Sequence, residues 1–132
     1  RRKMAGQGEM APVTAEDQQM INKFARLHNN FTSLTEEIKL LLTDVQNLSE
    51  AADEVMLLGD DEGIPLKMGS TFVHFSQDEM GEHLEQMKSE AERKVGEKKT
   101  EKEVMEEEMR RLKSFLYNKF GDRINLEAEP DD

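Results

Sequence analysis

Residues 20–55 have the sequence MINKFARLHNNFTSLTEEIKLLLTDVQNLSEAADEV. The apolar residues of this stretch are separated alternately by four and three positions, and they are Met20, Phe24, Leu27, Phe31, Leu34, Ile38, Leu41, Val45, Leu48, Ala52 and Val55. This pattern is a heptad repeat with a mean spacing of about 3.5 residues. Because a straight α-helix has about 3.6 residues per turn, such a seam stays on one side only if the helix winds around a partner. The stretch therefore predicts a long coiled-coil helix.

Capping signals mark both ends of this helix. Thr14 precedes Glu16 and Asp17, so a side-chain acceptor stands at the helix start and two carboxylates lie near the positive end of the helix dipole. Gly59 stands where a left-handed C-terminal cap is easiest to form. We therefore expect the first helix to begin at Thr14 and to end by Gly59.

A second long helix is predicted to begin at Ser76, because Ser76 and Glu79 have the spacing of a capping box. Its apolar positions follow two registers, one at Met80, Leu84, Met87 and Ala91 and the other at Met105, Met109, Leu112, Leu116 and Phe120. Residues 92–103 separate the two registers and have Val95 as their only apolar side chain, so weak packing is expected there. The two helices have similar lengths, about 44 residues or roughly 65 Å each. The prediction is a mainly α fold, an antiparallel two-helix coiled-coil hairpin.

A β-hairpin is predicted at the junction of the two helices. Residues 64–68 and 71–75 are short apolar runs separated by Gly69 and Ser70, which fits a tight two-residue turn. A two-stranded hairpin is marginal in water by itself, so its apolar side chains need cover from other chains. The residues expected to mediate this subunit assembly are Ile64, Leu66, Met68, Phe72, Val73 and Phe75.

Composition excludes several classes of function. The net charge is −11, from 18 basic and 29 acidic residues, which opposes binding to a phosphate backbone. The chain has no cysteine, so disulfide frameworks and thiolate metal sites are excluded. Its three histidines are scattered, and its glycines do not form a phosphate-binding pattern. We expect no metal, no cofactor, no membrane span and no enzymatic activity.

The domain organisation follows from these patterns. Residues 1–13 are expected to be a flexible N-terminal tail, in which Met4 is the candidate natural start. Residues 14–126 form the coiled-coil and hairpin domain, and residues 127–132 form an acidic C-terminal tail. That tail either keeps bound chains soluble, meets a basic partner surface, or is simply solvated.

Three segments carry a resemblance to a known family. They are residues 16–26 (EDQQMINKFAR), the hairpin with Ile64-Pro65, Met68-Gly69, Phe72 and Ser76-Gln77, and residues 116–127 (LYNKFGDRINLE). Over roughly residues 14–129 the chain resembles the β-class subunits of the prefoldin family. The extended start and the polar middle of the second helix depart from the family pattern.

The resemblance implies a prefoldin-like fold and a chaperone function. Prefoldin is a cytoplasmic heterohexamer of α-class and β-class subunits, so the implied partners are other prefoldin subunits. The resemblance further implies ATP-independent capture of unfolded client proteins of the actin and tubulin class. It also implies their transfer to the cytosolic group II chaperonin.

The free end of the helical hairpin is the expected client-binding site. Antiparallel pairing brings the start of the first helix to the end of the second, where Met and aromatic groups can repack against varied apolar surfaces. The candidate client-binding residues are Met20, Ile21, Phe24, Leu116, Tyr117, Phe120, Ile124 and Leu126. Heptad positions usually pack, so the alternative that they only close the seam is favoured for Met20, Phe24, Leu116 and Phe120. The other four lie off the seam or beyond the helix and are the better candidates.

Two other classes of protein compete with this interpretation. A structural coiled-coil spacer or tether would use the same seams, but it would not explain an apolar hairpin together with an apolar helix end. An arm that grips nucleic acid would need a basic stripe, whereas acidic and basic residues nearly cancel between residues 88 and 113.

Overall fold

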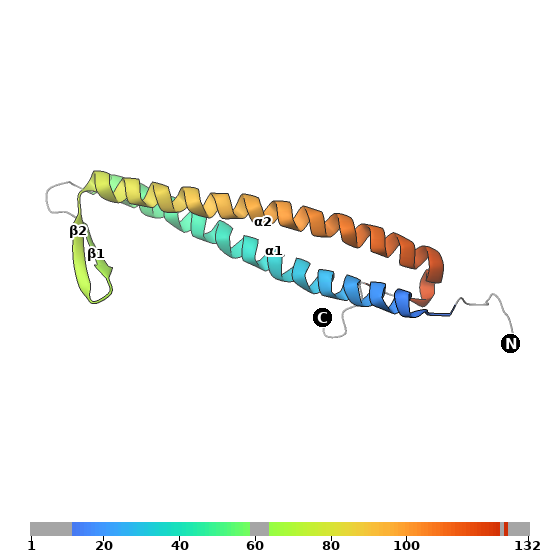
Figure 1. Ribbon diagram of the computed structural model, residues 1–132. Coiled ribbons are helices and arrows are strands. Elements are labelled where there is room, and N and C mark those ends of the chain that lie inside the picture. Colours follow the sequence, from blue (N-terminus) through green and yellow to red (C-terminus); the bar gives the residue numbers. More distant parts are fainter. Residues whose placement is uncertain (1–11, 59–63, 125, 127–132) are drawn as a thin grey trace. The chain divides into compact units, whose positions relative to one another are not determined.

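The structure is a computed structural model that describes residues 12–58, 64–124 and 126. The elements in chain order are α1 (Ala15–Met56), β1 (Ile64–Met68), β2 (Thr71–Phe75), α2 (Gln77–Phe120) and the short 3₁₀ helix η1 (Gly121–Arg123), as Figure 1 shows. The two long predicted helices are confirmed, with 42 residues in α1 and 44 in α2. Gly59, residues 1–11 of the predicted N-terminal tail and the whole predicted C-terminal tail, residues 127–132, lie outside the described residues.

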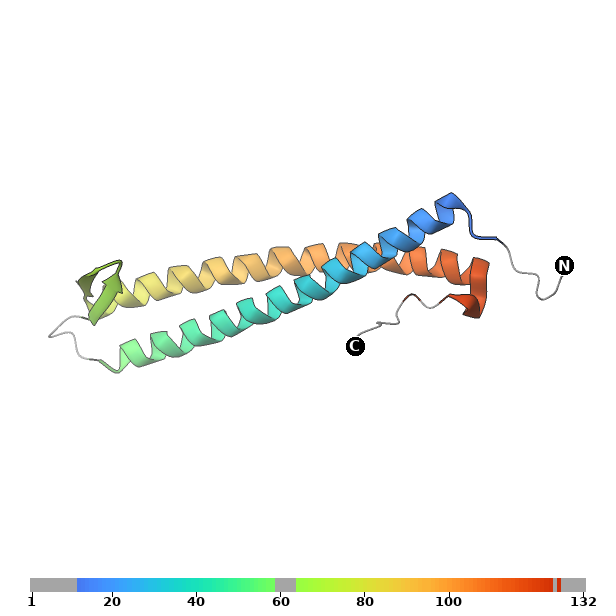
Figure 2. The ribbon, with the colours of Figure 1, turned by 90° about the horizontal axis from the view of Figure 1, so that it is seen from below.

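The chain divides into two compact units. Unit 1 comprises Arg1–Thr35 and Glu101–Asp132, and unit 2 comprises Glu36–Thr100. In unit 1 the Lys119 ammonium lies 2.7 Å from the Asp17 carboxylate, and the views in Figures 1 and 2 place the start of α1 beside the end of α2. In unit 2 the Gln77 amide donates a hydrogen bond of 2.9 Å to the carbonyl of Val55. Early residues of α1 therefore meet late residues of α2, and late residues meet early ones, so the helices are antiparallel within each unit.

Both predicted helix starts carry reciprocal caps. The Asp17 amide donates to Thr14 Oγ1 and the Thr14 amide donates to Asp17 Oδ2, both at 3.0 Å. The Glu79 amide donates to Ser76 Oγ at 3.1 Å, and the Ser76 amide donates to Glu79 Oε1 at 2.9 Å. Each box satisfies backbone N–H groups that have no partner inside the helix.

The seam of α1 is confirmed by burial. Phe24, Leu34, Ile38 and Val55 are buried, and the remaining seven heptad positions are half-buried. No heptad position of α1 is exposed among these described residues, whereas most residues between them are. The spacing of about 3.5 residues therefore identified the packed face of α1 correctly.

The seam of α2 differs from the prediction at two places. Met87, predicted to pack, is 45% exposed, because it lines an open groove of about 640 Å³ in unit 2 together with Leu41, Leu48 and Ala91. Val95, expected in a poorly packed stretch, is only 7% exposed.

Two lysines of α2 lie at seam positions in the polar stretch, Lys98 in unit 2 and Lys102 in unit 1. Lys98 and Lys102 are half-buried, so their stems cover the seam while their charged ends reach α1. Lys98 Nζ lies 3.0 Å from Glu37 Oε1 in unit 2, and Lys102 Nζ lies 5.1 Å from the centre of the Phe31 ring in unit 1. In each unit, therefore, a half-buried lysine occupies a seam position where the sequence is polar.

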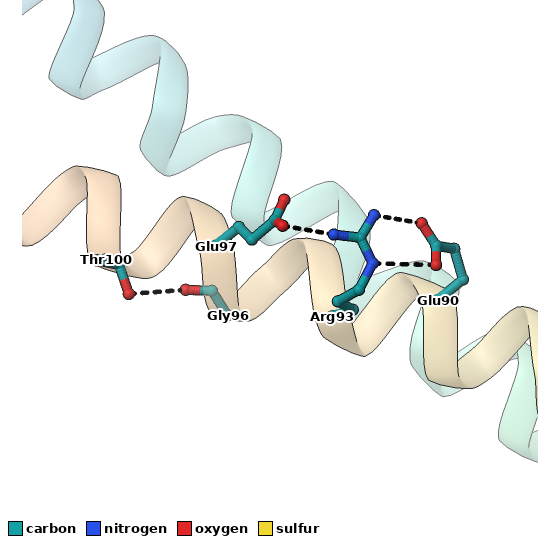
Figure 3. A network of polar contacts seen from close by, with 5 residues as sticks. All are labelled: Glu90, Arg93, Gly96, Glu97 and Thr100. Atoms are coloured by element: carbon teal, nitrogen blue, oxygen red, sulfur yellow. Dashed lines mark hydrogen bonds and ion pairs between the residues drawn. The ribbon is translucent and has the colours of Figure 1, made fainter.

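Polar contacts between exposed residues of α2 support this same stretch (Figure 3). Arg93 donates to Glu90 with an Nε to Oε1 distance of 3.0 Å, and it also pairs with Glu97 one turn later. The Thr100 hydroxyl donates to the carbonyl of Gly96 at 3.1 Å. The hydrogen bond from Arg93 lowers the pKa of Glu90. Exposed pairs at these spacings contribute only about 0.2–0.5 kcal/mol each to helix stability.

Replacing Gly96 with alanine is expected to raise the free energy of unfolding by about 0.5–1 kcal/mol. Gly96 is an exposed helix-interior residue, and a methyl group there meets nothing within 4 Å. The measurement is chemical unfolding followed by helical circular dichroism. Gly121→Ala is the matched control, because Gly121 also has open space but has a φ of 60°, so alanine there is expected to destabilise. Equal shifts of the same sign would contradict the argument.

The two strands form an antiparallel hairpin in unit 2. Ile64 pairs with Phe75 and Met68 pairs with Thr71, which leaves Gly69 and Ser70 as the turn. Gly69 has a φ of 66°, which glycine adopts without a side-chain clash. The described sheet has two strands.

Candidate functional site

The heptad candidates of unit 1 form a closed core. Leu116 is 0% exposed, Phe24 2% and Phe120 5%, while Met20 is half-buried. Of the two interpretations left open for these four residues, the structure favours packing within the seam for Phe24, Leu116 and Phe120. They support the helix end rather than present themselves to a ligand.

An ion pair joins the ends of the two helices next to this core. Lys119 Nζ lies 2.7 Å from Asp17 Oδ2, the same oxygen that accepts the Thr14 amide. Asp17 is only 2% exposed. The hydrogen bonds from Lys119 and then from Thr14 lower the pKa of Asp17, against a smaller opposing effect of desolvation. The ionised carboxylate therefore connects the first turn of α1 to the last turn of α2.

Two cations cover the Phe120 ring at the end of α2. Lys119 Nζ lies 5.5 Å from the ring centre, and the Arg123 guanidinium carbon lies 5.1 Å from it. Arg123 Nε also donates to the Phe120 carbonyl at 3.1 Å. Gly121, with a φ of 60°, lets the chain turn into η1 immediately after Phe120. Cations over an aromatic face are attracted by its quadrupole, so these contacts hold the turn against the helix end.

The four off-seam candidates lie in two groups in unit 1. Ile21 and Ile124 line a small cavity of about 210 Å³, together with Val13, Phe120 and Arg123. The Leu126 amide donates to the Tyr117 hydroxyl at 3.1 Å. All four candidates, Ile21, Tyr117, Ile124 and Leu126, are half-buried. Each thus keeps part of its surface available to a ligand.

Several exposed apolar residues of unit 1 were not predicted as site residues. Phe115 is 46% exposed, Val13 56% and Val104 63%, and they add apolar surface to unit 1. The heptad pattern could have found Phe115, because it stands next to the seam residue Leu116 and therefore off the seam. Nothing in the sequence pattern indicated the pairing of Asp17 with Lys119, which are 102 positions apart.

The predicted assembly residues are only partly described. The backbones of β1 and β2 are described, but the side chains of Ile64, Leu66, Met68, Phe72 and Val73 lie outside the described residues. Phe75 is half-buried, and its ring stacks on His83 with 6.1 Å between ring centres.

Other apolar side chains are exposed where α1 ends. Met56 is 73% exposed, Leu57 85% and Leu58 50%. Unit 2 thus exposes three consecutive apolar residues that the sequence analysis did not list for assembly.

Metal-ligand clusters and membrane-spanning helices were both sought among the described residues. Within residues 12–58, 64–124 and 126, no three histidine or carboxylate side chains are grouped so that they could hold a metal ion. None of the helices described here contains an apolar stretch long enough to cross a bilayer.

Lowering the pH is expected to weaken unit 1 through Asp17. Its folded pKa lies below the ordinary value of 3.8, so its contribution is fully present above that value and is lost as the pH falls through the lower folded pKa. The unfolding midpoint of the unchanged chain should therefore fall more steeply than that of Asp17→Asn as the pH drops below the ordinary pKa of 3.8. Thermal unfolding at a series of pH values measures this difference. Glu108→Gln, which removes the more exposed pair with Lys23, is the control and should show a smaller change. Parallel pH profiles for the unchanged chain and Asp17→Asn would contradict the prediction.

Comparisons with known proteins agree with the architecture. A family model described as "Prefoldin subunit" matches residues 18–123. The chain is 50% identical to a Caenorhabditis briggsae protein named "Probable prefoldin subunit 4", over 90% of this chain and 96% of that one. It is 42% identical to human "Prefoldin subunit 4", over 89% of this chain and 88% of that one.

A solved structure shares the fold. The crystal structure of the prefoldin beta subunit from Thermococcus strain KS-1 superposes with a TM-score of 0.75, at 14% identity, over 85% of this chain and 98% of that one. The family model covers most of the chain, and the relatives match it over nearly their whole lengths. The chain therefore belongs to the prefoldin subunit family.

Proposed function

We propose that the chain is one subunit of a heterohexameric, ATP-independent co-chaperone that captures unfolded polypeptides of the actin and tubulin class. In this proposal the complex works in the cytosol and transfers its clients to the group II chaperonin. Membership of the prefoldin family supports the assembly, and the apolar surfaces at the helix ends support the capture.

The single observation that carries the proposal is the exposed apolar surface of unit 2. Met56, Leu57 and Leu58 are exposed in succession, and the described sheet in the same unit has two strands. A two-stranded sheet is marginal alone, and its edges have unpaired backbone groups that can pair with another chain. Such a surface is typical of a protein interaction site. In the proposed complex, neighbouring subunits bury this surface.

Client capture is assigned to unit 1. Its end combines half-buried aliphatic groups with Tyr117 and the exposed ring of Phe115. Such surfaces bind exposed apolar segments weakly and without strict sequence requirements. Several weak sites in one complex gain strength through their high effective concentration.

The proposal is tested by native mass spectrometry of the complex purified from cells through a tag on this chain. A six-subunit particle that contains one copy of this chain is the expected result. The same particle should suppress aggregation of diluted unfolded actin without nucleotide and release the actin when group II chaperonin is added. A homodimer, or a complex with one large filament or tether protein, would favour a structural coiled-coil spacer instead.

A further inference from the structure

The open groove of unit 2 is an incompletely filled part of the coiled-coil seam. Its volume is about 640 Å³, and its apolar lining consists of Leu41, Leu48, Met87 and Ala91. All four stand at heptad positions, which the facing helix of a coiled coil normally covers. Here Met87 is 45% exposed, and the other three are only half-buried. The described residues of unit 2 therefore leave apolar seam surface without full cover.

An exposed leucine extends this apolar surface along α1. Leu40 is 59% exposed. It stands four residues before Asp44 and seven before Asn47, which both line the groove, so it lies on the same side of α1. Leu41 and Leu48 are seven residues apart, which is about 10.5 Å along the helix axis. The apolar surface is therefore a stripe along the helix rather than a pocket for one side chain.

Three residues that are charged at neutral pH border the groove. They are Asp44 from α1, and Glu90 and Lys94 from α2. Arg93 forms an ion pair with Glu90, as Figure 3 shows. The hydrogen bond from Arg93, and to a smaller extent the charge of Lys94, lower the pKa of Glu90. Both cations thus act on Glu90, whereas Asp44 on the opposite wall is exposed and has no ion pair among the described residues.

The rest of unit 2 determines the sign of the electrostatic field around the groove. Glu36–Thr100 contains 16 acidic and seven basic residues, a net charge of −9. The whole chain has a net charge of −11, so most of its excess negative charge belongs to unit 2. Two of the seven basic residues, Arg93 and Lys98, are already held in ion pairs within the unit. A region of this sign attracts basic partners and repels acidic ones.

We propose that this groove binds an amphipathic α-helix of a partner protein, with leucine-like residues at heptad spacing and lysines or arginines beside them. The partner helix lies along α1 and α2, and its apolar residues fill the space between Leu41, Leu48 and Met87 to form a three-helix bundle. Its basic residues face Asp44 and the acidic surface around the groove. Methionine suits such a site, because its unbranched side chain adapts to the shape of a partner.

This interaction goes beyond the proposed function. The groove lies in unit 2, whereas the candidate client-binding residues lie in unit 1. The occupant is a formed helix with a repeating apolar face, whereas a client is an unfolded chain without a fixed pattern. The groove would therefore recruit a particular class of partner to the complex.

The chain offers two matched pairs of variants for the test. Met87 and Leu42 are 45% and 46% exposed and both belong to unit 2, but only Met87 lines the groove. Asp44 and Asp53 are both exposed carboxylates of α1, and only Asp44 borders the groove. Within each pair the two substitutions change hydrophobicity or net charge equally and differ in their position relative to the groove.

The experiment measures photo-cross-linking of designed peptides to this chain in the complex purified through a tag on it. The first peptide is about three heptads long, with leucine at the heptad positions, one photoreactive leucine analogue and lysine elsewhere. A second peptide replaces the lysines with glutamates. A third has a central proline, which breaks the helix. We expect the first peptide to give the highest yield and to label residues 41–48 and 83–94.

The variants should separate groove binding from general attraction. Met87→Ser is expected to reduce the yield of the first peptide about tenfold, and Leu42→Ser less than about threefold, because only Met87 is covered by the bound helix. Asp44→Lys should reduce the yield more than Asp53→Lys, although both change the net charge by the same amount. Circular dichroism checks that each variant retains its helices.

Several results would overturn the inference. Equal losses within either matched pair would do so, as would a glutamate peptide that labels the groove as well as the lysine peptide. Equal labelling by the proline peptide would indicate capture of an unfolded chain instead of a helix. Labelling only of the isolated chain would assign the groove to a neighbouring subunit of the complex. Suppression of aggregation should be unchanged by Met87→Ser, and its loss would make the groove part of client capture rather than a separate site.

Discussion

Replacing Leu116 with alanine is expected to lower the free energy of unfolding by about 2–5 kcal/mol, the largest stability effect of any substitution considered for this chain. Leu116 has no exposed surface, and it packs in unit 1, where Phe24 and Phe120 are the other buried apolar side chains near the helix ends. The substitution removes buried methyl groups and leaves a cavity, because two helices joined by an ion pair at their ends cannot close fully around the smaller side chain. Chemical unfolding of the assembled complex, followed by circular dichroism, measures the loss.

Phe115→Ala is the matched control for this experiment. Phe115 is the adjacent residue on the same helix, but it is 46% exposed. Its replacement is expected to cost less, since nearly half of the Phe115 surface already contacts water. Equal destabilisation by the two variants would show that the buried face of α2 has been assigned to the wrong residues.

The second large effect is expected on client capture. Replacing the four off-seam candidates Ile21, Tyr117, Ile124 and Leu126 with serine should reduce the yield of client cross-linked to this subunit by about tenfold. Each half-buried side chain offers apolar surface to a client, and about 1.4 kcal/mol of lost contact already gives a factor of ten. The yield is measured with an unfolded client that carries a photoreactive label. Cross-linking to this subunit is the readout because the other subunits keep their own client sites.

Assembly should be unaffected by this variant, since none of the four residues belongs to unit 2. Native mass spectrometry of the variant complex checks that point. Leu40→Ser combined with Leu42→Ser serves as the control, because these residues are 59% and 46% exposed but lie in unit 2. Unchanged cross-linking in the four-residue variant would show that the off-seam residues are not part of the client-binding site.

Much of the helical architecture was predictable from local patterns. The spacing of apolar residues in α1 identified its packed face, and the Thr14 and Ser76 capping signals located both helix starts to within one residue. These signals are strong because heptad spacing and capping depend on residues a few positions apart. Membership of the prefoldin family was also predictable, because segments at both ends and at the hairpin resemble the family.

The middle of α2 was harder to predict from its pattern. Residues 92–103 lack the apolar side chains that a search for heptads requires, yet Val95 is buried and the half-buried Lys98 and Lys102 continue the seam. A lysine can cover an apolar face with its stem while its ammonium pairs with a partner. Whether it does so depends on what the facing helix offers, here Glu37 and Phe31.

The candidate site, too, could be predicted from the sequence only in part. The sequence could identify the apolar residues near the helix ends, and it could separate seam from off-seam positions by counting. It could not show that Asp17 and Lys119 pair across 102 positions, or that Phe24, Phe31, Met109 and Arg110 line one groove. Those arrangements depend on the relative axial position of two antiparallel helix segments.

The sequence alone thus determined the helices, their packed faces, their caps and the family to which the chain belongs. Only the tertiary structure decided which residues of α1 meet which residues of α2, and therefore which cations border an aromatic groove and which carboxylate is buried beside a lysine. The physical reason is that the caps are hydrogen bonds within one helix turn and the packed faces follow from helical periodicity. Contacts across the seam instead depend on how the large side chains of both helices pack together.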